Sequence, residues 1–331
     1  MKEEGYILQG KEVSIGYKKR QAVHTVGHAL SFDLKKGQLT CLLGPNGVGK
    51  STLIKTIMGQ IPSLSGTINF LGTNIKAHHP KNLAKKISVV LTDKVSAGNL
   101  TVQQLVSLGR TPFTNWLGKL TEEDQQIVEE ALRSTKTYYL KDQLISEVSD
   151  GQLQKVMIAR ALAQDGELII LDEPTAHLDL INRYEIMHLL KEITEKREKT
   201  ILVITHDLEI AIETADELWI MQCGEPLLFG APEDLIISGK INQLIPSQQL
   251  TFDPNLGKIR PTNKMEYTTI AGPPNITHWL KLALEKNHIH LTDDISILAL
   301  EDPSGFKVSG KDFAKEFPNI HSLILFLKSH N

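Results

Sequence analysis

Gly44-Pro45-Asn46-Gly47-Val48-Gly49-Lys50-Ser51-Thr52 is the most informative stretch of this sequence, because its residue types and spacing are those of a phosphate-binding loop. It follows the apolar run 39–43 and precedes residues 51–59, whose apolar side chains have helical spacing. Glycines let backbone N–H groups turn toward phosphate oxygens, and the helix directs its positive amino end at the same anion. Lys50 is suited to the β- and γ-phosphates, and the Ser51 hydroxyl to Mg²⁺. The alternative, a chance glycine turn before a helix, does not explain the complete pattern.

A second apolar run ends in two carboxylates. Residues 168–171 are followed by Asp172 and Glu173, and open α/β sheets bind their ligands at strand ends of this kind. Asp172 is suited to hold Mg²⁺, directly or through water, and Glu173 to polarise an attacking water. An isolated segment of this kind is more often a strand that ends in a solvated acidic turn. The phosphate-binding loop upstream favours the nucleotide interpretation.

Strands alternate with helices around these two segments. Residues 201–204 form another buried strand, and residues 184–196 before it have helical spacing. This alternation predicts an α/β fold with a parallel sheet covered by helices. Residues 11–17 and 29–34 are predicted to form strands ahead of that core, and residues 217–229 a hairpin across Cys223-Gly224-Glu225.

Two regions depart from the alternating pattern. Residues from about 95 to 165 have helical spacing: Leu105 and Leu108 fit one helix, and Thr121 is the predicted cap of another. Beyond Gly239 the chain is at first rich in Pro, Asn and Thr. The predicted elements of this tail are a helix with Ile276, Trp279, Leu280, Ala283 and Leu284 on one face, a strand over 295–300 and a helix over 320–327. We therefore expect one domain over residues 1–240 and a small α+β domain over 245–331.

Composition excludes several classes of protein. The chain has 331 residues, 41% of them hydrophobic and 23% charged, and a net charge of −3, which does not suggest a nucleic-acid partner. No apolar run approaches the roughly 20 residues that span a bilayer, and the first residues do not resemble a secretory signal. Cys41 and Cys223 lack metal-ligand spacing. These features predict a cytosolic chain, which could still dock on a membrane protein.

Further segments resemble an ATP-binding cassette (ABC) protein, in the order that this family has them. Ser149-Asp150-Gly151-Gln152 is similar to the family's signature motif, and the resemblance implies that it contacts ATP on a partner subunit. Thr175-Ala176-His177-Leu178-Asp179 resembles the segment that meets the partner, through Leu178 and Asp179. Thr205-His206-Asp207 resembles the switch histidine, and Tyr17 stands where the family stacks an aromatic ring on adenine. The resemblance covers roughly residues 8 to 240.

The resemblance implies a phosphate-loop NTPase fold with a RecA-like parallel sheet core, an N-terminal antiparallel β subdomain and an α-helical subdomain. ATP and Mg²⁺ are the implied cofactors, with Ser51 and Asp172 as metal contacts and Glu173 and His206 as catalytic residues. Two cassettes would pair head to tail with ATP sandwiched between them, and hydrolysis would drive transmembrane permease subunits. This places the chain as a peripheral protein on the cytoplasmic face of the cell (inner) membrane.

Two positions differ from the family pattern. Asp150 stands where a second glycine is usual, although the flanking Ser149 and Gly151 are retained. The family has a glutamine at the end of a strand before the helical subdomain, where it contacts Mg²⁺. In this sequence the position falls near Thr92, whose shorter side chain reaches a metal only through water, and Asp93 is an alternative ligand.

Residues 100–106 and 108–112 are similar to the helical subdomain of importers for iron–siderophores, haem and vitamin B12. In those importers a periplasmic or lipoprotein substrate-binding protein delivers the cargo to the permease. The alternative is that any cassette protein needs such helix packing. For residues 245–331 we hypothesise a regulatory or dimer-stabilising role; the turn 271–275 could place an anion at a helix start, but a proline turn that caps the helix is favoured.

Two rival functions belong to other classes. Soluble cassette proteins that act on ribosomes or in DNA repair usually carry two cassettes or a long coiled coil, whereas this chain has one cassette and no sustained heptads. An exporter partner is also compatible with the cassette alone. A scaffold that binds ATP without hydrolysing it is disfavoured, because Lys50, Asp172, Glu173 and His206 are all present.

Overall fold

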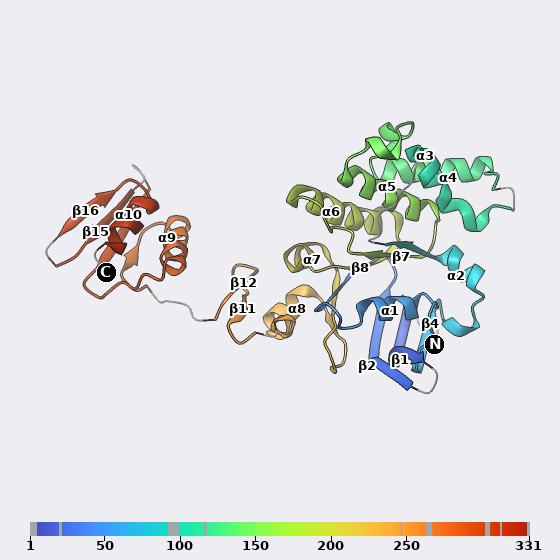
Figure 1. Cartoon of the computed structure of the whole chain (residues 1–331), viewed down its shortest axis with the longest axis horizontal. Helices are drawn as coiled ribbons and strands as arrows, with labels where there is room; N and C mark the ends of the chain where they lie inside the picture. The colour runs from blue at the N-terminus through green and yellow to red at the C-terminus, as the bar shows by residue number, and fades with distance from the viewer. Residues whose placement is uncertain are drawn as a thin grey trace. The chain divides into compact units, whose positions relative to one another are not determined.

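The computed structural model describes residues 5–19, 22–91, 99–115, 118–245, 247–262, 267–301, 305–311 and 313–329 (Figure 1). The chain divides into two compact units, one of Met1–Pro246 with Phe252–Lys258 and the other of Ser247–Thr251 with Ile259–Asn331. The hydrophobic cores divide in the same way, two in the first unit and one in the second. The first unit thus extends a few residues beyond the predicted end at residue 240.

A six-stranded sheet in the order β10-β9-β3-β8-β7-β6 forms the centre of the first unit. Neighbouring strands are parallel except for β10, which pairs antiparallel with β9 and so confirms the predicted hairpin. The strands are β3 (Leu39–Leu43), β6 (Ile87–Val90), β7 (Leu168–Asp172), β8 (Thr200–Ile204), β9 (Glu217–Ile220) and β10 (Leu228–Gly230).

Both faces of this sheet are covered, which is why its strands are continuous apolar runs. Successive residues point to opposite faces, so Leu42 and Ile170 belong to one hydrophobic core, and Cys41 and Ile169 to the other. Helices follow or connect these strands. They are α1 (Lys50–Ile57), α2 (Pro80–Lys86), α6 (Leu180–Arg197), α7 (Leu208–Thr214) and α8 (Pro232–Ile237), with the 3-10 segments η1 (Ile75–Ala77) and η5 (Lys240–Leu244).

An antiparallel sheet in the order β2-β1-β4-β5 contributes to one of these cores. Its strands are β1 (Tyr6–Lys19), β2 (Ala22–Lys35), β4 (Ser65–Phe70) and β5 (Thr73–Asn74). Phe32 of β2 packs against Trp219 of β9, with ring centroids 5.2 Å apart. The strands predicted at 11–17 and 29–34 are present but longer, because β1 and β2 pair along nearly their whole length.

The helical group α3, α4 and α5 stands together above the central sheet in Figure 1, and its members pack against one another. Its elements are α3 (Val102–Ser107), α4 (Glu122–Ser134) and α5 (Asp150–Ala163), with the 3-10 segments η2 (Leu108–Phe113), η3 (Tyr138–Leu140) and η4 (Ile145–Glu147). The Thr121 hydroxyl accepts the backbone N–H of Asp124, which confirms the predicted cap of α4.

One prediction in this region is wrong. Leu108 does not continue the helix of Leu105 but begins η2, and half of its surface is exposed. The tighter 3-10 turn lets Gly109 lie directly against α5, where a Cβ atom would stand 2.2 Å from the carbonyl oxygen of Arg160.

The second unit is an α+β fold. Its sheet has the order β13-β14-β15-β16, in which β13 and β14 are parallel and the other pairs antiparallel. The elements are β13 (Ile270–Ala271), α9 (Pro274–Lys286), β14 (Ser296–Leu300), β15 (Gly305–Ser309), β16 (Ala314–Phe317) and α10 (Ile320–Lys328). A two-stranded sheet of β11 (Leu250–Asp253) and β12 (Lys258–Pro261) precedes them.

Trp279 was expected on the buried face of α9 and is instead 61% exposed. The buried stripe of this helix is centred on Thr277, Leu280 and Leu284, and Trp279 lies outside that stripe at the helical angle of about 100° per residue. Within the residues that the structure describes, no helix has both the length and the apolar character that crossing a membrane requires.

Candidate nucleotide-binding site

The phosphate-binding loop connects β3 to α1, at the carboxyl end of a central strand. Two of its glycines are required by the backbone. Gly49 has a φ of 112°, and a Cβ atom there would stand 2.4 Å from Cγ1 of Val26. A Cβ atom on Gly44 would stand 2.4 Å from the carbonyl oxygen of Met221. The loop therefore needs glycine at both positions to keep its curvature.

Lys50, the first residue of α1, is buried beneath the loop. Its ammonium donates hydrogen bonds to the carbonyl oxygens of Gly44 at 2.6 Å and Pro45 at 3.1 Å. Burial lowers the pKa of this ammonium, and the carboxylates of Glu173 and Asp172 oppose the shift. The buried ammonium of Lys50 attracts an anion such as a phosphate to the loop. The nearby carboxylates favour an anion that arrives with a bound cation.

Two strand ends bring the acidic residues and the histidine together. Asp172 ends β7, Glu173 follows it, and His206 comes two residues after β8. Glu173 has a left-handed backbone, with a φ of 52°, and its N–H donates to the carbonyl oxygen of Ile204 at 2.9 Å. This less common conformation aims the carboxylate at His206, whose Nε2 lies 2.8 Å from Oε1 of Glu173.

The protonation states suit a general base. Burial raises the pKa of the Glu173 carboxyl, Lys50 opposes that shift, and Asp172 and Asp207 add to it. Burial and then Lys50 lower the pKa of His206, so the imidazole is neutral at neutral pH. A carboxylate with a raised pKa accepts a proton more readily near neutral pH than an ordinary glutamate does.

One cavity of about 380 Å³ contains these groups. It is lined by Val26, Asn46, Gly47, Gly49, Lys50, Ser51, Thr52, Asp172, Glu173, Ile204 and His206. The predicted metal and catalytic residues thus converge on the cavity with most of the loop. Gly44, Pro45 and Val48 belong to the loop but do not line the cavity. Tyr17 lies beside it, 43% exposed, with its hydroxyl 3.0 Å from Oγ1 of Thr52.

Val26 and Ile204 were not predicted. Ile204 is the last residue of a buried strand, and its position beside the two acidic residues could have been inferred from the parallel sheet. Val26 comes from β2 of the other sheet and reaches the cavity through tertiary packing, for which the sequence carries no local signal.

The predicted signature motif forms the start of α5, away from that cavity. The Ser149 hydroxyl accepts the N–H of Gln152 at 3.3 Å, and the Gln152 side chain accepts the N–H of Ser149 at 2.9 Å. This reciprocal capping box fixes the helix start. Asp150 is exposed in the first turn, where a negative charge is favourable. These residues do not line the cavity of their own chain.

The signature motif contacts the segment that follows Glu173. Asp179 caps α6, and its carboxylate accepts hydrogen bonds from the N–H and the amide Nδ2 of Asn182, both at 2.8 Å. Asn182 in turn lies against Gly151, where a Cβ atom would stand 2.6 Å from Oδ1. Leu178 packs into the core, so of the two predicted interface residues only Asp179 presents its side chain at the surface.

A hydrogen-bond network beside the site was also not predicted from the sequence. The Asp207 carboxylate accepts hydrogen bonds from the Thr175 hydroxyl at 2.8 Å and from Arg183 Nη1 at 3.2 Å. These contacts hold the segment after Glu173 against the one after His206. Thr92 and Asp93, the candidate replacements for the family's glutamine, lie outside the described residues.

We expect Gly151→Ala to slow ATP turnover by about tenfold to a hundredfold, the usual cost of overpacking a tight contact, without weakening ATP binding to the single subunit. The added methyl group would displace Asn182 and shift the helix start. Steady-state hydrolysis and nucleotide binding measure the two effects. The double variant with Asn182→Ala should recover turnover, and wild-type turnover by Gly151→Ala alone would remove this helix start from the reaction.

Comparisons with known proteins identify the family of the chain. Residues 28–176 match the ABC transporter family model. An ABC transporter ATP-binding protein of Methanocaldococcus jannaschii is 36% identical, over 76% of this chain and 85% of that protein. The iron(3+)-hydroxamate import ATP-binding protein of Bacillus subtilis is 33% identical, over 76% and 92%. The ferric enterobactin transport ATP-binding protein of Escherichia coli is 32% identical, over 72% and 86%.

The fold has solved counterparts. A dimeric structure of a bacterial ABC transporter cassette superposes with a TM-score of 0.57 at 25% identity, covering 68% of this chain and 98% of that one. The superposed part is a cassette, so the predicted α/β cassette fold, with its parallel core, antiparallel sheet and helical group, is confirmed.

Proposed function

This chain belongs to the ABC transporter family, and we propose that it is the ATP-hydrolysing subunit of an importer for iron chelates. The observation that carries the proposal is the convergence of Lys50, Asp172, Glu173 and His206 on one cavity beside the phosphate-binding loop. A scaffold that only bound ATP would not need a carboxylate with a raised pKa whose Oε1 lies 2.8 Å from Nε2 of His206.

Each residue then has a distinct task. Loop N–H groups and Lys50 bind the β- and γ-phosphates, while Tyr17 stacks on adenine. Glu173 accepts the proton of the attacking water, and His206 holds that water and the γ-phosphate in line. Ser51 and Asp172 line the same cavity with oxygen ligands, which fit a magnesium ion carried by ATP. Bound there, Mg²⁺ would neutralise charge that develops on the phosphate oxygens.

Turnover requires a second copy of the chain. The signature residues do not line their own chain's cavity, and a head-to-tail pair would bring Ser149 and Gly151 of each copy to the ATP of the other. Asp179, which holds Asn182 against Gly151, would then lie at the boundary between the copies. ATP binding closes such a dimer and hydrolysis opens it, which is the motion that a transporter uses.

We assign the permease contact to an open, largely apolar groove of about 950 Å³ between α2, the end of α1 and the carboxyl half of α5. Its lining includes Met58, Ile61, Leu83, Ile87, Leu91 and Met157. Apolar side chains in an open groove favour a protein partner over water. Docking there would hold the chain on the cytoplasmic face of the membrane. A substrate-binding protein would act on the opposite face and would reach this chain only through the permease.

Uptake by cells tests the cargo. In cells where a Glu173→Gln variant replaces the native chain, uptake of iron-labelled hydroxamate or catecholate chelates should fall to background, because transport needs hydrolysis. Labelled haem and cobalamin distinguish the related cargoes. Loss of haem or cobalamin uptake alone would change the cargo class, and unchanged import of every cargo would favour an exporter or a cassette outside transport.

We further propose that the second unit stabilises or regulates the cassette dimer. Truncation after Thr262 keeps β11 and β12 and leaves the two cores of the first unit intact. We expect the ATP concentration for half-maximal hydrolysis to rise about fivefold or more, a typical coupling effect. If hydrolysis, dimerisation and uptake are all unchanged in the truncated chain, the second unit has another role.

A further inference from the structure

The carboxyl end of α5 is attached to the edge of the central sheet. The side chain of Gln164, which follows α5, donates hydrogen bonds to the carbonyl oxygens of Ala84 at 2.6 Å and Ile87 at 2.9 Å. These two residues belong to the end of α2 and the start of β6. The other end of α5 carries the signature residues, about 20 Å away at 1.5 Å per residue. One rigid helix therefore connects this attachment to Ser149.

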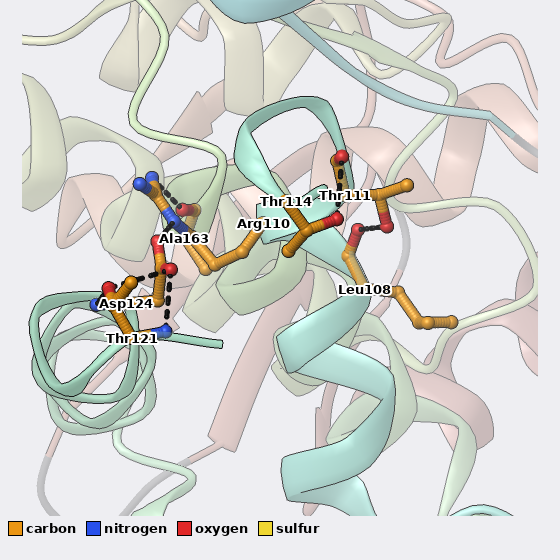
Figure 2. A network of polar contacts seen from close by, with 7 residues as sticks. All are labelled: Leu108, Arg110, Thr111, Thr114, Thr121, Asp124 and Ala163. Carbon is orange, nitrogen blue, oxygen red and sulfur yellow. Dashed lines mark hydrogen bonds and ion pairs between the residues drawn. The ribbon is translucent and has the colours of Figure 1, made fainter. Parts of the chain in front are cut away.

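Arg110 of η2 makes a second attachment at the same end, which Figure 2 shows. Its guanidinium is buried, donates from Nη1 to the carbonyl oxygen of Ala163 at 3.0 Å, and pairs through Nε with Asp124 at 2.8 Å. Asp124 is itself fixed, because the N–H and hydroxyl of Thr121 donate to its second oxygen at 3.0 and 2.8 Å. The guanidinium plane is thus held in one orientation.

Phe113 extends this attachment toward the sheet. The guanidinium carbon of Arg110 lies 4.0 Å from the centre of its ring, and the ammonium of Lys85 lies 5.1 Å from the same centre. Lys85 belongs to α2, on the side of β6, whereas Arg110 belongs to the helical group. Phe113 is 39% exposed, so core packing does not account for it. An aromatic ring that attracts two cations from different parts of the fold links those parts, and we call this arrangement a clamp.

We propose that Phe113 is a positioning residue: through its contacts with both Arg110 and Lys85, it fixes α5, and with it the signature motif, relative to the sheet that carries the phosphate-binding loop. This inference rests on the proposed head-to-tail dimer. Each ATP site of that dimer combines the loop of one copy with the signature motif of the other. Both sites can close at the same time only if the loop and the signature motif are held at the same relative position in each copy. Loosening the clamp therefore weakens closure of the dimer and leaves nucleotide binding by each single copy intact.

The test uses the full chain with Glu173→Gln and measures the dissociation constant of the ATP-dependent dimer. Adding Phe113→Leu, which keeps the apolar bulk and removes the ring, should weaken the dimer by about fivefold to twentyfold, since each dimer contains the clamp twice. Phe113→Trp keeps an aromatic face and should restore the dimer. Labelled ATP, used at protein concentrations too low for dimers, should bind the single copies with unchanged affinity.

Phe229→Leu is the matched control, because Phe229 is similarly exposed, at 44%, on β10. Lys85→Met removes one of the two cations and leaves the sequence of η2 unchanged. It should weaken the dimer by about twofold to fivefold. If Glu173→Gln alone does not dimerise with ATP, the proposed function fails. If it dimerises and neither Phe113→Leu nor Lys85→Met weakens the dimer, or Phe113→Trp behaves as Phe113→Leu does, the positioning role is wrong.

Discussion

Glu173→Gln should reduce ATP hydrolysis to below about 1% of the wild-type rate, because a positioned general base contributes roughly 10²- to 10⁴-fold. The amide has nearly the shape of the carboxylate but cannot accept the proton of the attacking water. The side chain keeps its length, so the 2.8 Å approach of His206 Nε2 and the cavity should be preserved. ATP should therefore bind, and because it is not hydrolysed, the dimer that it closes should persist.

Three measurements on one preparation separate these effects: hydrolysis, binding of labelled ATP, and molecular mass with and without ATP. Glu225→Gln, at an exposed turn, is the matched control and should behave as the wild type in all three. If Glu173→Gln hydrolyses ATP at the wild-type rate, Glu173 is not the base. If it is inactive and also fails to bind ATP, the substitution has damaged the site.

Lys50→Met should weaken ATP binding by about a hundredfold or more, because charge-assisted hydrogen bonds to phosphate are worth about 1.5–3 kcal/mol each. Methionine fills a similar volume, and it removes a buried charge whose pKa burial already lowers. We therefore expect the nucleotide-free variant to be no less stable than the wild type. The substitution should therefore lower the affinity for ATP without lowering the stability of the nucleotide-free protein.

Thermal unfolding measures both the stability of the nucleotide-free protein and its stabilisation by ATP. ATP at a hundred times its dissociation constant should stabilise the wild type by about 2.7 kcal/mol, whereas the same concentration should stabilise Lys50→Met by at most about 0.4 kcal/mol. Lys55→Met, an exposed lysine on the same helix, should respond to ATP as the wild type does. A full response by Lys50→Met would exclude Lys50 from phosphate binding.

Much of the site was predictable because its parts are local in sequence or lie at strand ends. The loop that leads into Lys50 specifies its own curvature, and a parallel sheet brings the carboxyl ends of β7 and β8 to one edge. Glu173 and His206 therefore meet although more than thirty residues separate them in the sequence. The caps at Thr121 and Ser149 are equally local, since each pairs with a residue three positions later.

What escaped prediction depends on packing between distant segments. Val26 reaches the cavity from another sheet, and Arg183 of α6 donates to Asp207, which follows β8. Trp279 has the spacing of a core residue, but the buried stripe of its helix is set by where the sheet lies. The contacts of Phe113 with Lys85 and Arg110 form only when folding brings α2 beside η2. No periodicity or motif records such contacts.

Mixing two variants that are each impaired in hydrolysis tests most directly whether hydrolysis needs a composite site. In a head-to-tail pair of Glu173→Gln with Gly151→Ala, one ATP site contains both substitutions and the other contains neither. Equal amounts mixed before ATP is added should therefore recover about one quarter of the wild-type rate, since half of the dimers are mixed and each has one intact site. A mixture whose rate is only the average of the rates of its two components would contradict the composite site.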